Sequence, residues 1–221
     1  MTVDEPDEPK RQSRQKRVGD ALRRDTRNRL LEAAGDEFTA HGYTRATVTR
    51  IAAGAGVSVQ TLYLAWGSKR ELLRGYMEKS LAGSAASPED VISRFTGKSP
   101  SERLEELADL VAEVAERAAP GWRLYRDASA VDPEIAADWD ELQLLRHQAF
   151  ARVVGGIPAA ALADGLTPEA AVDTAWTIAS PDSYDLLVHR RGYEPGEFRD
   201  WMKQTLIAAV LAPRADAKPT A

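Results

Sequence analysis

The stretch "IAAGAGVSVQTLYLAWGSK", residues 51–69, combines the features of a turn with those of a helix. Two glycines lie close together, whereas the apolar residues around them repeat at helical spacing. Gly56 is placed to take a positive φ, which lets the chain reverse sharply. Ser58 follows and offers a side-chain oxygen that can cap a new helix. The pattern predicts two short helices, 47–53 and 58–66, joined by a tight turn, which is a helix-turn-helix.

The start of the second predicted helix carries small or neutral polar residues, namely Ser58, Val59, Gln60 and Thr61. In a helix-turn-helix, the second helix enters the DNA major groove with its N-terminal residues leading. A glutamine can pair with adenine, and the methyl groups of valine and threonine can pack on thymine. Leu62 and Trp66 are expected to face inward. The alternative is a helical hairpin inside an ordinary all-α core.

Charge is distributed unevenly along the chain, whose net charge is −5. Residues 10–80 carry 15 basic and 7 acidic side chains, whereas residues 81–221 carry 14 basic and 23 acidic ones. This asymmetry favours nucleic-acid binding by the N-terminal part, with chance clustering as the alternative. A basic run at 10–17 is either a solvated tail or an arm that follows DNA phosphates or enters the minor groove.

The remaining sequence predicts an all-α fold of about nine helices. Helix starts are marked by a capping residue followed by proline, as at 99–102, 132–134, 167–169 and 180–182. The first helix is expected over about 20–41, with Gly42 ending it. We expect four regions: a disordered basic arm over 1–19, a three-helix DNA-binding domain over 20–80, a helical ligand-binding and dimerisation domain over 81–212, and a disordered tail over 213–221.

Several classes of function find no support in the sequence. The chain has no cysteine, and its three histidines lie far apart, so no metal is expected. The glycines of "GAGVSV" lack the third glycine of a dinucleotide-binding motif and follow a helix, so neither a cofactor nor enzyme activity is expected. The acidic N-terminus is unlike a signal peptide, and no segment is long and apolar enough to span a membrane. These observations predict a cytoplasmic protein.

The segment "LLEAAGDEFTAHGYTRATVTRIAAGAGVSVQTLYLAWGSKRELL", residues 30–73, resembles the DNA-binding domain of the tetracycline-repressor (TetR) family of transcriptional regulators. The resemblance implies that Thr47 and Tyr63 contact phosphates and that Thr49 reaches towards bases or backbone. It also implies that Ser58, Val59, Gln60 and Thr61 lie in the groove, and that Lys69 pairs with the DNA backbone. Two residues depart from the family pattern. Ala65 stands where a histidine or tyrosine is frequent, and Trp66 replaces a phenylalanine.

The resemblance further implies a homodimer that binds a pseudo-palindromic DNA operator as a repressor and leaves it when a small-molecule effector binds. The expected ligand-binding residues are Trp122, Tyr125, Arg126, Trp139, His147, Phe150 and Trp176, with plain core packing as the alternative for each. Two apolar stripes, around 171–179 and 198–209, form either the dimer interface or the core of one subunit. An activator, a ligand-independent regulator and a helical interaction module remain alternatives.

Overall fold

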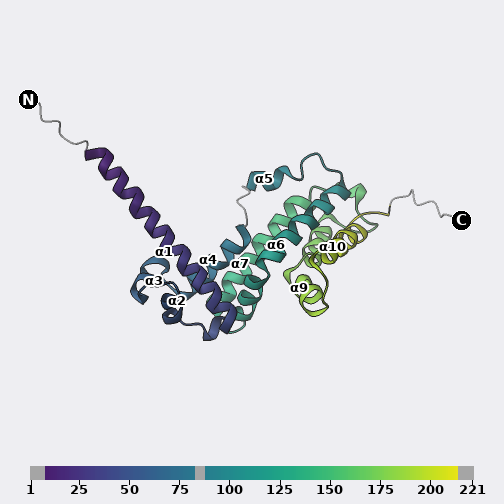
Figure 1. Ribbon diagram of the computed structural model, residues 1–221. Helices are drawn as coiled ribbons and strands as arrows, with labels where there is room; N and C mark the ends of the chain where they lie inside the picture. Colours follow the sequence, from purple (N-terminus) through teal and green to yellow (C-terminus); the bar gives the residue numbers. More distant parts are fainter. Residues whose placement is uncertain (1–7, 83–87, 214–221) are drawn as a thin grey trace, which may run out of the picture. The chain divides into compact units, whose positions relative to one another are not determined.

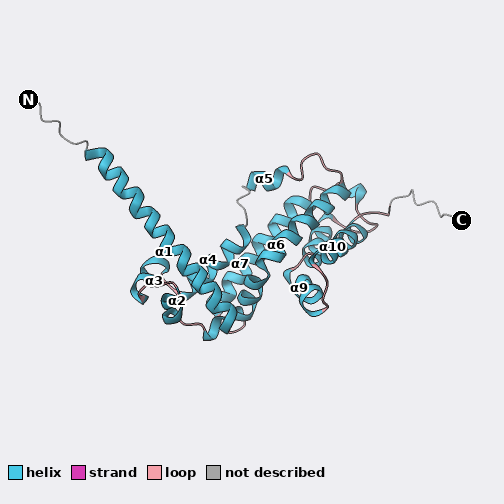
Figure 2. Cartoon of the chain, in the orientation of Figure 1, coloured by secondary structure: helices cyan, strands magenta, loops and turns pink. Residues whose placement is uncertain are grey.

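The computed structural model describes residues 8–82 and 88–213, with side chains described for 17–82 and 91–213 (Figure 1). These residues form helices joined by loops, and their one β-type contact is a bridge between Leu162 and Leu211 (Figure 2). The predicted all-α fold is therefore confirmed. The chain divides into two compact units, and the boundary lies between residues 78 and 79. The start of the predicted arm and the end of the predicted tail lie outside the described residues.

The helices follow one another along the chain with short connections. Their bounds are α1 Glu8–Arg45, α2 Val48–Gly54, α3 Val59–Trp66, α4 Lys69–Ala82, α5 Pro88–Ser93, α6 Pro100–Ser129, α7 Pro133–Val154, α8 Pro168–Ile178, α9 Pro181–Tyr184 and α10 Pro195–Val210. A short 3-10 turn, η1 Ala159–Ala161, precedes α8, and a π-helix, η2 Asp185–Arg190, follows α9. No helix within the described ranges is both long and apolar enough to cross a membrane.

The first helix starts earlier than the sequence predicts. It begins at Glu8 rather than near Asp20, so the prediction of a disordered arm is wrong for residues 8–19. Pro9 is compatible with a helix because it lies in the first turn, where backbone amides need no helical partner. The lysines, arginines and glutamines that follow are good helix formers even without an apolar face.

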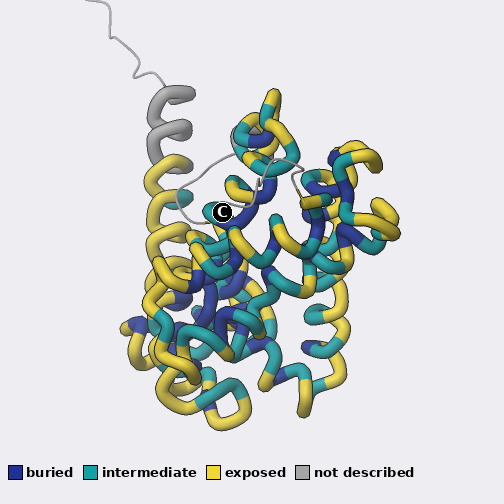
Figure 3. The backbone as a smooth tube through the Cα atoms, turned by 90° about the vertical axis from the view of Figure 1, so that its right-hand side faces the viewer, coloured by how far each residue is buried: buried dark blue, intermediate teal, exposed yellow. Residues whose placement is uncertain are grey.

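The first unit is built on the C-terminal half of α1, against which α2 and α3 pack (Figure 1). Leu30, Ala34 and Phe38 lie on one face of α1, as predicted, and are fully buried. Ile51 of α2 and Leu62 of α3 are equally buried, and Figure 3 colours such positions dark blue. These contacts fix both short helices on α1, because isolated helices of this length are marginal in water.

Capping residues start the helices of the second unit where the sequence predicts them. In α6, Ser99 accepts a hydrogen bond from the Glu102 amide, and the Glu102 carboxylate accepts one from the Ser99 amide. The side chains of Asp132, Thr167 and Ser180 cap α7, α8 and α9 by accepting hydrogen bonds from backbone amides of the first turn. The π-helix after α9 has no counterpart in the prediction.

The two apolar stripes of the second unit close its core. Their fully or almost fully buried members are Ala171, Ala175, Ala179, Phe198, Met202 and Leu206. They pack in one cluster with residues of α6 and α7. These six residues therefore form the core of one subunit, which was one of the two alternatives for the stripes. A dimer interface would need other residues of the unit.

Candidate nucleic-acid interface and ligand cavity

The turn between α2 and α3 has the geometry that its glycines predict. Gly56 has a φ of 66°, and the Val57 amide donates to the Ala52 carbonyl at 2.9 Å. The side-chain oxygen of Ser58 then accepts a hydrogen bond from the Thr61 amide at 3.0 Å and caps α3. The predicted helix-turn-helix is present with both helix bounds within one residue of the expected ones.

The residues at the start of α3 differ in how accessible their polar groups are. The hydroxyl oxygens of Ser58 and Thr61 lie 2.9 Å apart and share a hydrogen bond. Gln60 is exposed, and within the described part of the chain its side-chain carboxamide has no hydrogen-bond partner. Val59 is partly exposed, and Tyr63 exposes 49% of its surface. Gln60 thus combines exposure with unused hydrogen-bonding groups at the start of α3.

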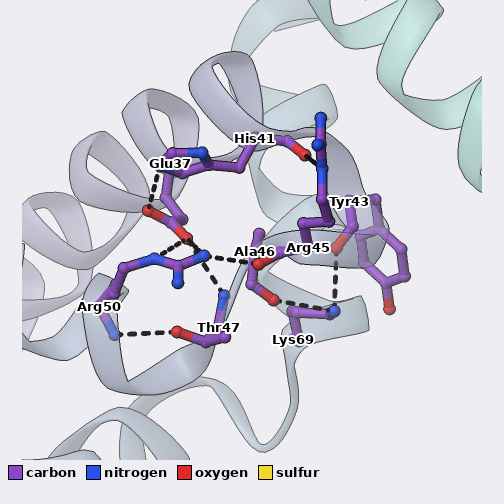
Figure 4. A network of polar contacts seen from close by, with 8 residues as sticks. All are labelled: Glu37, His41, Tyr43, Arg45, Ala46, Thr47, Arg50 and Lys69. Atoms are coloured by element: carbon purple, nitrogen blue, oxygen red, sulfur yellow. Dashed lines mark hydrogen bonds and ion pairs between the residues drawn. The ribbon is translucent and has the colours of Figure 1, made fainter.

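The start of α2 is held by a carboxylate of α1 (Figure 4). One Glu37 oxygen, Oε1, accepts hydrogen bonds from Arg50 Nε at 2.6 Å and from the Thr47 amide at 3.2 Å. The hydrogen bond from Arg50 lowers the pKa of Glu37. Thr47 in turn caps α2 by accepting from the Arg50 amide at 3.3 Å. These bonds fix Thr47 at the head of α2, while Thr49, two residues further on, remains exposed.

Lys69 lies at the start of α4, where it contacts the connection between α1 and α2 (Figure 4). Its ammonium group donates to the carbonyl oxygens of Tyr43 at 2.9 Å and Ala46 at 3.1 Å. It also lies 4.2 Å from the centre of the Tyr43 ring. The family resemblance implies a DNA phosphate as the partner of Lys69, but the partners seen here are backbone carbonyls.

Trp66 packs against the first helix, as predicted. Its indole nitrogen donates to the Arg27 carbonyl at 3.3 Å, and the Arg27 guanidinium lies 3.7 Å from the ring centroid. The same guanidinium donates to the Ala65 carbonyl. Arg27 therefore binds the C-terminal end of α3, whose last carbonyls lack helical partners. The two positions that depart from the family pattern are held together by one arginine of α1.

Arg45 is an exposed cation that the sequence reasoning did not single out. It lies two residues before Thr47, and its Nε donates to the His41 carbonyl at 3.2 Å (Figure 4). Within the described residues it has no carboxylate partner, in contrast to Arg50. The sequence could have indicated Arg45 as a candidate phosphate contact, because it is a basic residue just before the cap of α2.

The second unit contains a cavity of about 510 Å³. Its walls come mainly from apolar side chains of α5, α6 and α7, and Leu81, Phe95 and residues 179–181 also contribute. Trp122 and Phe150, both expected to bind a ligand, are among the lining residues. A mostly apolar cavity of this volume has the properties of a small-molecule site. Among the described residues, no group of three His, Asp or Glu side chains could hold a metal ion.

The other expected ligand residues do not line this cavity; they are Tyr125, Arg126, Trp139, His147 and Trp176. Tyr125 is buried in the core, and Trp139 packs edge-on against Trp122 with ring centroids 5.5 Å apart. Arg126 donates to Asp182 at 2.6 Å, and His147 lies 2.8 Å from Asp173. Arg126 and His147, the two charged or titratable polar residues of the expected set, therefore both have carboxylate partners.

Three polar lining residues were not expected from the sequence: Arg146, Arg152, which is exposed, and Ser180. Arg146 is the partly buried arginine of this set. It precedes Phe150 by four residues on α7, so both side chains lie on the same face of the helix. The guanidinium lies 5.0 Å from the Phe150 ring centroid and 5.1 Å from that of Trp176. The sequence could have indicated Arg146 as a lining residue, because its spacing of four residues from Phe150 places both on one face of a helix.

The turn between α2 and α3 and the capped, exposed start of α3 are typical of helix-turn-helix DNA-binding domains. Residues 30–76 match the model of the bacterial regulatory proteins of the tetR family. A curated relative, the HTH-type transcriptional repressor SCO4008 of Streptomyces coelicolor, is 39% identical over 70 residues. That match covers 30% of this chain and 36% of the relative's length. The N-terminal unit is therefore similar to the DNA-binding domain of the tetR family of bacterial regulatory proteins, and the chain spans about a third of the length of the curated relative that it matches.

Solved structures share the fold well beyond the N-terminal unit. NalD of Pseudomonas aeruginosa, the secondary repressor of the MexAB-OprM multidrug efflux pump, has a TM-score of 0.66 and 20% identity over 84% of this chain and 95% of NalD. SmeT, solved as a complex with triclosan, has a TM-score of 0.64 and 17% identity over 86% of this chain and 93% of SmeT. At these identities the likeness establishes a common fold.

Proposed function

We propose that this protein is a sequence-specific DNA-binding repressor that works as a homodimer in the cytoplasm. The observation that carries the proposal is the start of α3, where Gln60 is exposed beside a capped helix N-terminus. Gln60 reads an adenine in the major groove, and the methyl group of Val59 packs on a thymine. Thr47, Thr49, Tyr63 and Arg45 contact the phosphates on either side.

Two subunits bind a pseudo-palindromic operator because each places one α3 in a major groove. The half-sites lie about 34 Å apart, which is one turn of the DNA helix. Lys69 and the Glu37–Arg50 pair act indirectly, because they fix the segment that carries Thr47. The curated repressor that matches the N-terminal unit supports this assignment.

A small molecule in the cavity of the second unit releases the operator. It acts by favouring a conformation in which the two α3 helices no longer fit successive major grooves. The apolar cavity, with Trp122 and Phe150 in its wall, supports the ligand part of the proposal. The complex of the structurally similar SmeT with triclosan is consistent with it.

Selection of bound fragments from genomic DNA, using the purified full chain, tests the proposal. The expected result is enrichment of a small set of sites that share a palindromic sequence. Enrichment without a shared sequence, or none at all, would contradict sequence-specific binding. Substituting Gln60 by alanine provides the control, since loss of the preference at one position of the shared sequence would trace that part of the selection to α3.

A further inference from the structure

Of the two arginines that line this mostly apolar cavity, Arg152 is exposed, whereas Arg146 is partly buried and places a positive charge at the wall. Its Nη2 atom donates to the carbonyl oxygens of Trp176 and, at 2.9 Å, of Ala179. Both carbonyls belong to the C-terminal end of α8, where helical partners are lacking. These bonds orient the guanidinium but leave its charge without an anion.

Arg146 forms no ion pair among the described residues, although the charge of Asp182 acts on it from a distance. In the described part of the chain, no carboxylate oxygen lies within 4.0 Å of its nitrogen atoms, whereas Arg126 has Asp182 at 2.6 Å. Burial lowers the pKa of Arg146 to about 10, so the group stays protonated near neutral pH. A guanidinium withdrawn from water is costly unless it is paired. The cavity therefore favours an occupant that brings a negative charge.

We propose that the cavity binds an apolar molecule with one anionic group, and that Arg146 pairs with this group. The apolar part fills the space lined by residues such as Leu107, Val111 and Leu142. A guanidinium presents parallel N–H groups that match a carboxylate or a similar oxyanion. The inference rests on the proposed function for the role of this molecule as the effector.

The alternative is that Arg146 only caps α8 and that the cavity prefers uncharged molecules. Arg103 provides a matched control for this alternative. It too is a partly buried arginine that binds the end of a helix, since its Nη1 donates to the Val153 carbonyl at 3.2 Å. It is not among the residues that line the cavity.

Calorimetric titration of the full chain with decanoate and with uncharged decanamide tests the proposal. Charge-assisted hydrogen bonds predict that the wild type binds decanoate about tenfold to a hundredfold more tightly. Arg146→Gln removes this preference, Arg103→Gln keeps it, and Arg146→Lys, which retains the charge, keeps part of it. Equal binding of both compounds by the wild type, or no binding of decanoate, would overturn the proposal even if Arg146→Gln failed to fold.

Operator binding, measured separately on a selected site, keeps the two proposals distinguishable. Decanoate that binds through Arg146 and releases the operator supports both. A decanoate preference in a protein that selects no DNA sequence supports the ligand inference and contradicts the proposed function. Specific DNA binding together with equal affinities for decanoate and decanamide contradicts only the ligand inference.

Discussion

The indole ring of Trp66 occupies the space in which a side chain at Gly75 would lie. A Cβ atom at Gly75 would come within 3.0 Å of two atoms of the ring, closer than real Cβ atoms approach other groups. Gly75 is buried in α4, and Trp66 is the last residue of α3. The absence of a side chain at Gly75 thus allows a residue larger than the family's phenylalanine at position 66.

This relationship predicts a reversal of sign in a pair of substitutions. Gly75→Ala should destabilise the wild type by about 1–3 kcal/mol, because it overpacks the contact with Trp66. In a Trp66→Phe background the same change should be neutral or stabilise by up to about 1 kcal/mol, because alanine is the better helix former. Urea unfolding of the four proteins measures the coupling. Equal effects of Gly75→Ala in both backgrounds would contradict the contact.

Glu37 should make the stability of the first unit depend on pH. Its pKa is lowered by the hydrogen bond from Arg50, so its contribution is complete above the usual value of 4.5 and is lost as the pH falls through the lowered value. Glu37→Gln should therefore destabilise the protein near neutral pH and have less effect in acid. Thermal unfolding between about pH 7 and pH 3 measures this. Asp36→Asn, at a neighbouring exposed carboxylate, should have little effect at either pH.

Much of the fold could be predicted because local signals agree with the packing. Ser58, Ser99 and Thr167 are capping residues in the sequence and cap helices in the structure. The start of α1 could not be predicted in the same way. Residues 8–19 have helix-forming side chains but no apolar stripe, and a helix is predicted from sequence mainly by such a stripe.

The candidate sites were less predictable, because they depend on contacts between distant residues. The sequence does not reveal that Lys69 meets the carbonyls of Tyr43 and Ala46, 26 and 23 residues away. It suggests aromatic residues for the cavity, but most of them serve the core or pair with each other. Arg146 shares a helix face with Phe150, yet only the fold brings it to the end of α8.

Lys69 should contribute to DNA binding through the structure of the first unit rather than through a phosphate. Lys69→Met should destabilise the protein by about 1–2 kcal/mol, because it removes two hydrogen bonds. It should weaken DNA binding without changing the salt dependence. Arg45→Gln should instead reduce the slope of log K against log salt by about 0.9 for each phosphate that the protein no longer neutralises. Fluorescence anisotropy over a salt series separates the two effects, and a reduced slope for Lys69→Met would assign it a phosphate.

Gln60 should determine one position of the operator. Gln60→Ala should cost about 1–3 kcal/mol on the selected site and relax the preference at a single base pair in each half-site. Affinities for duplexes with each base pair replaced in turn would locate that position. Thermal unfolding provides the control, since an exposed side chain without partners should contribute little to stability. A uniform loss over all duplexes would contradict base recognition by Gln60.

The most direct test of the central claim compares equilibrium binding of the full chain to a selected operator and to a scrambled duplex of the same composition. Sequence-specific DNA-binding proteins bind their sites about 10³-fold to 10⁷-fold more tightly than other DNA. We predict a preference in this range at physiological salt, with both affinities falling steeply as salt rises. Equal affinity for the two duplexes at every salt concentration would contradict the claim that α3 reads a DNA sequence.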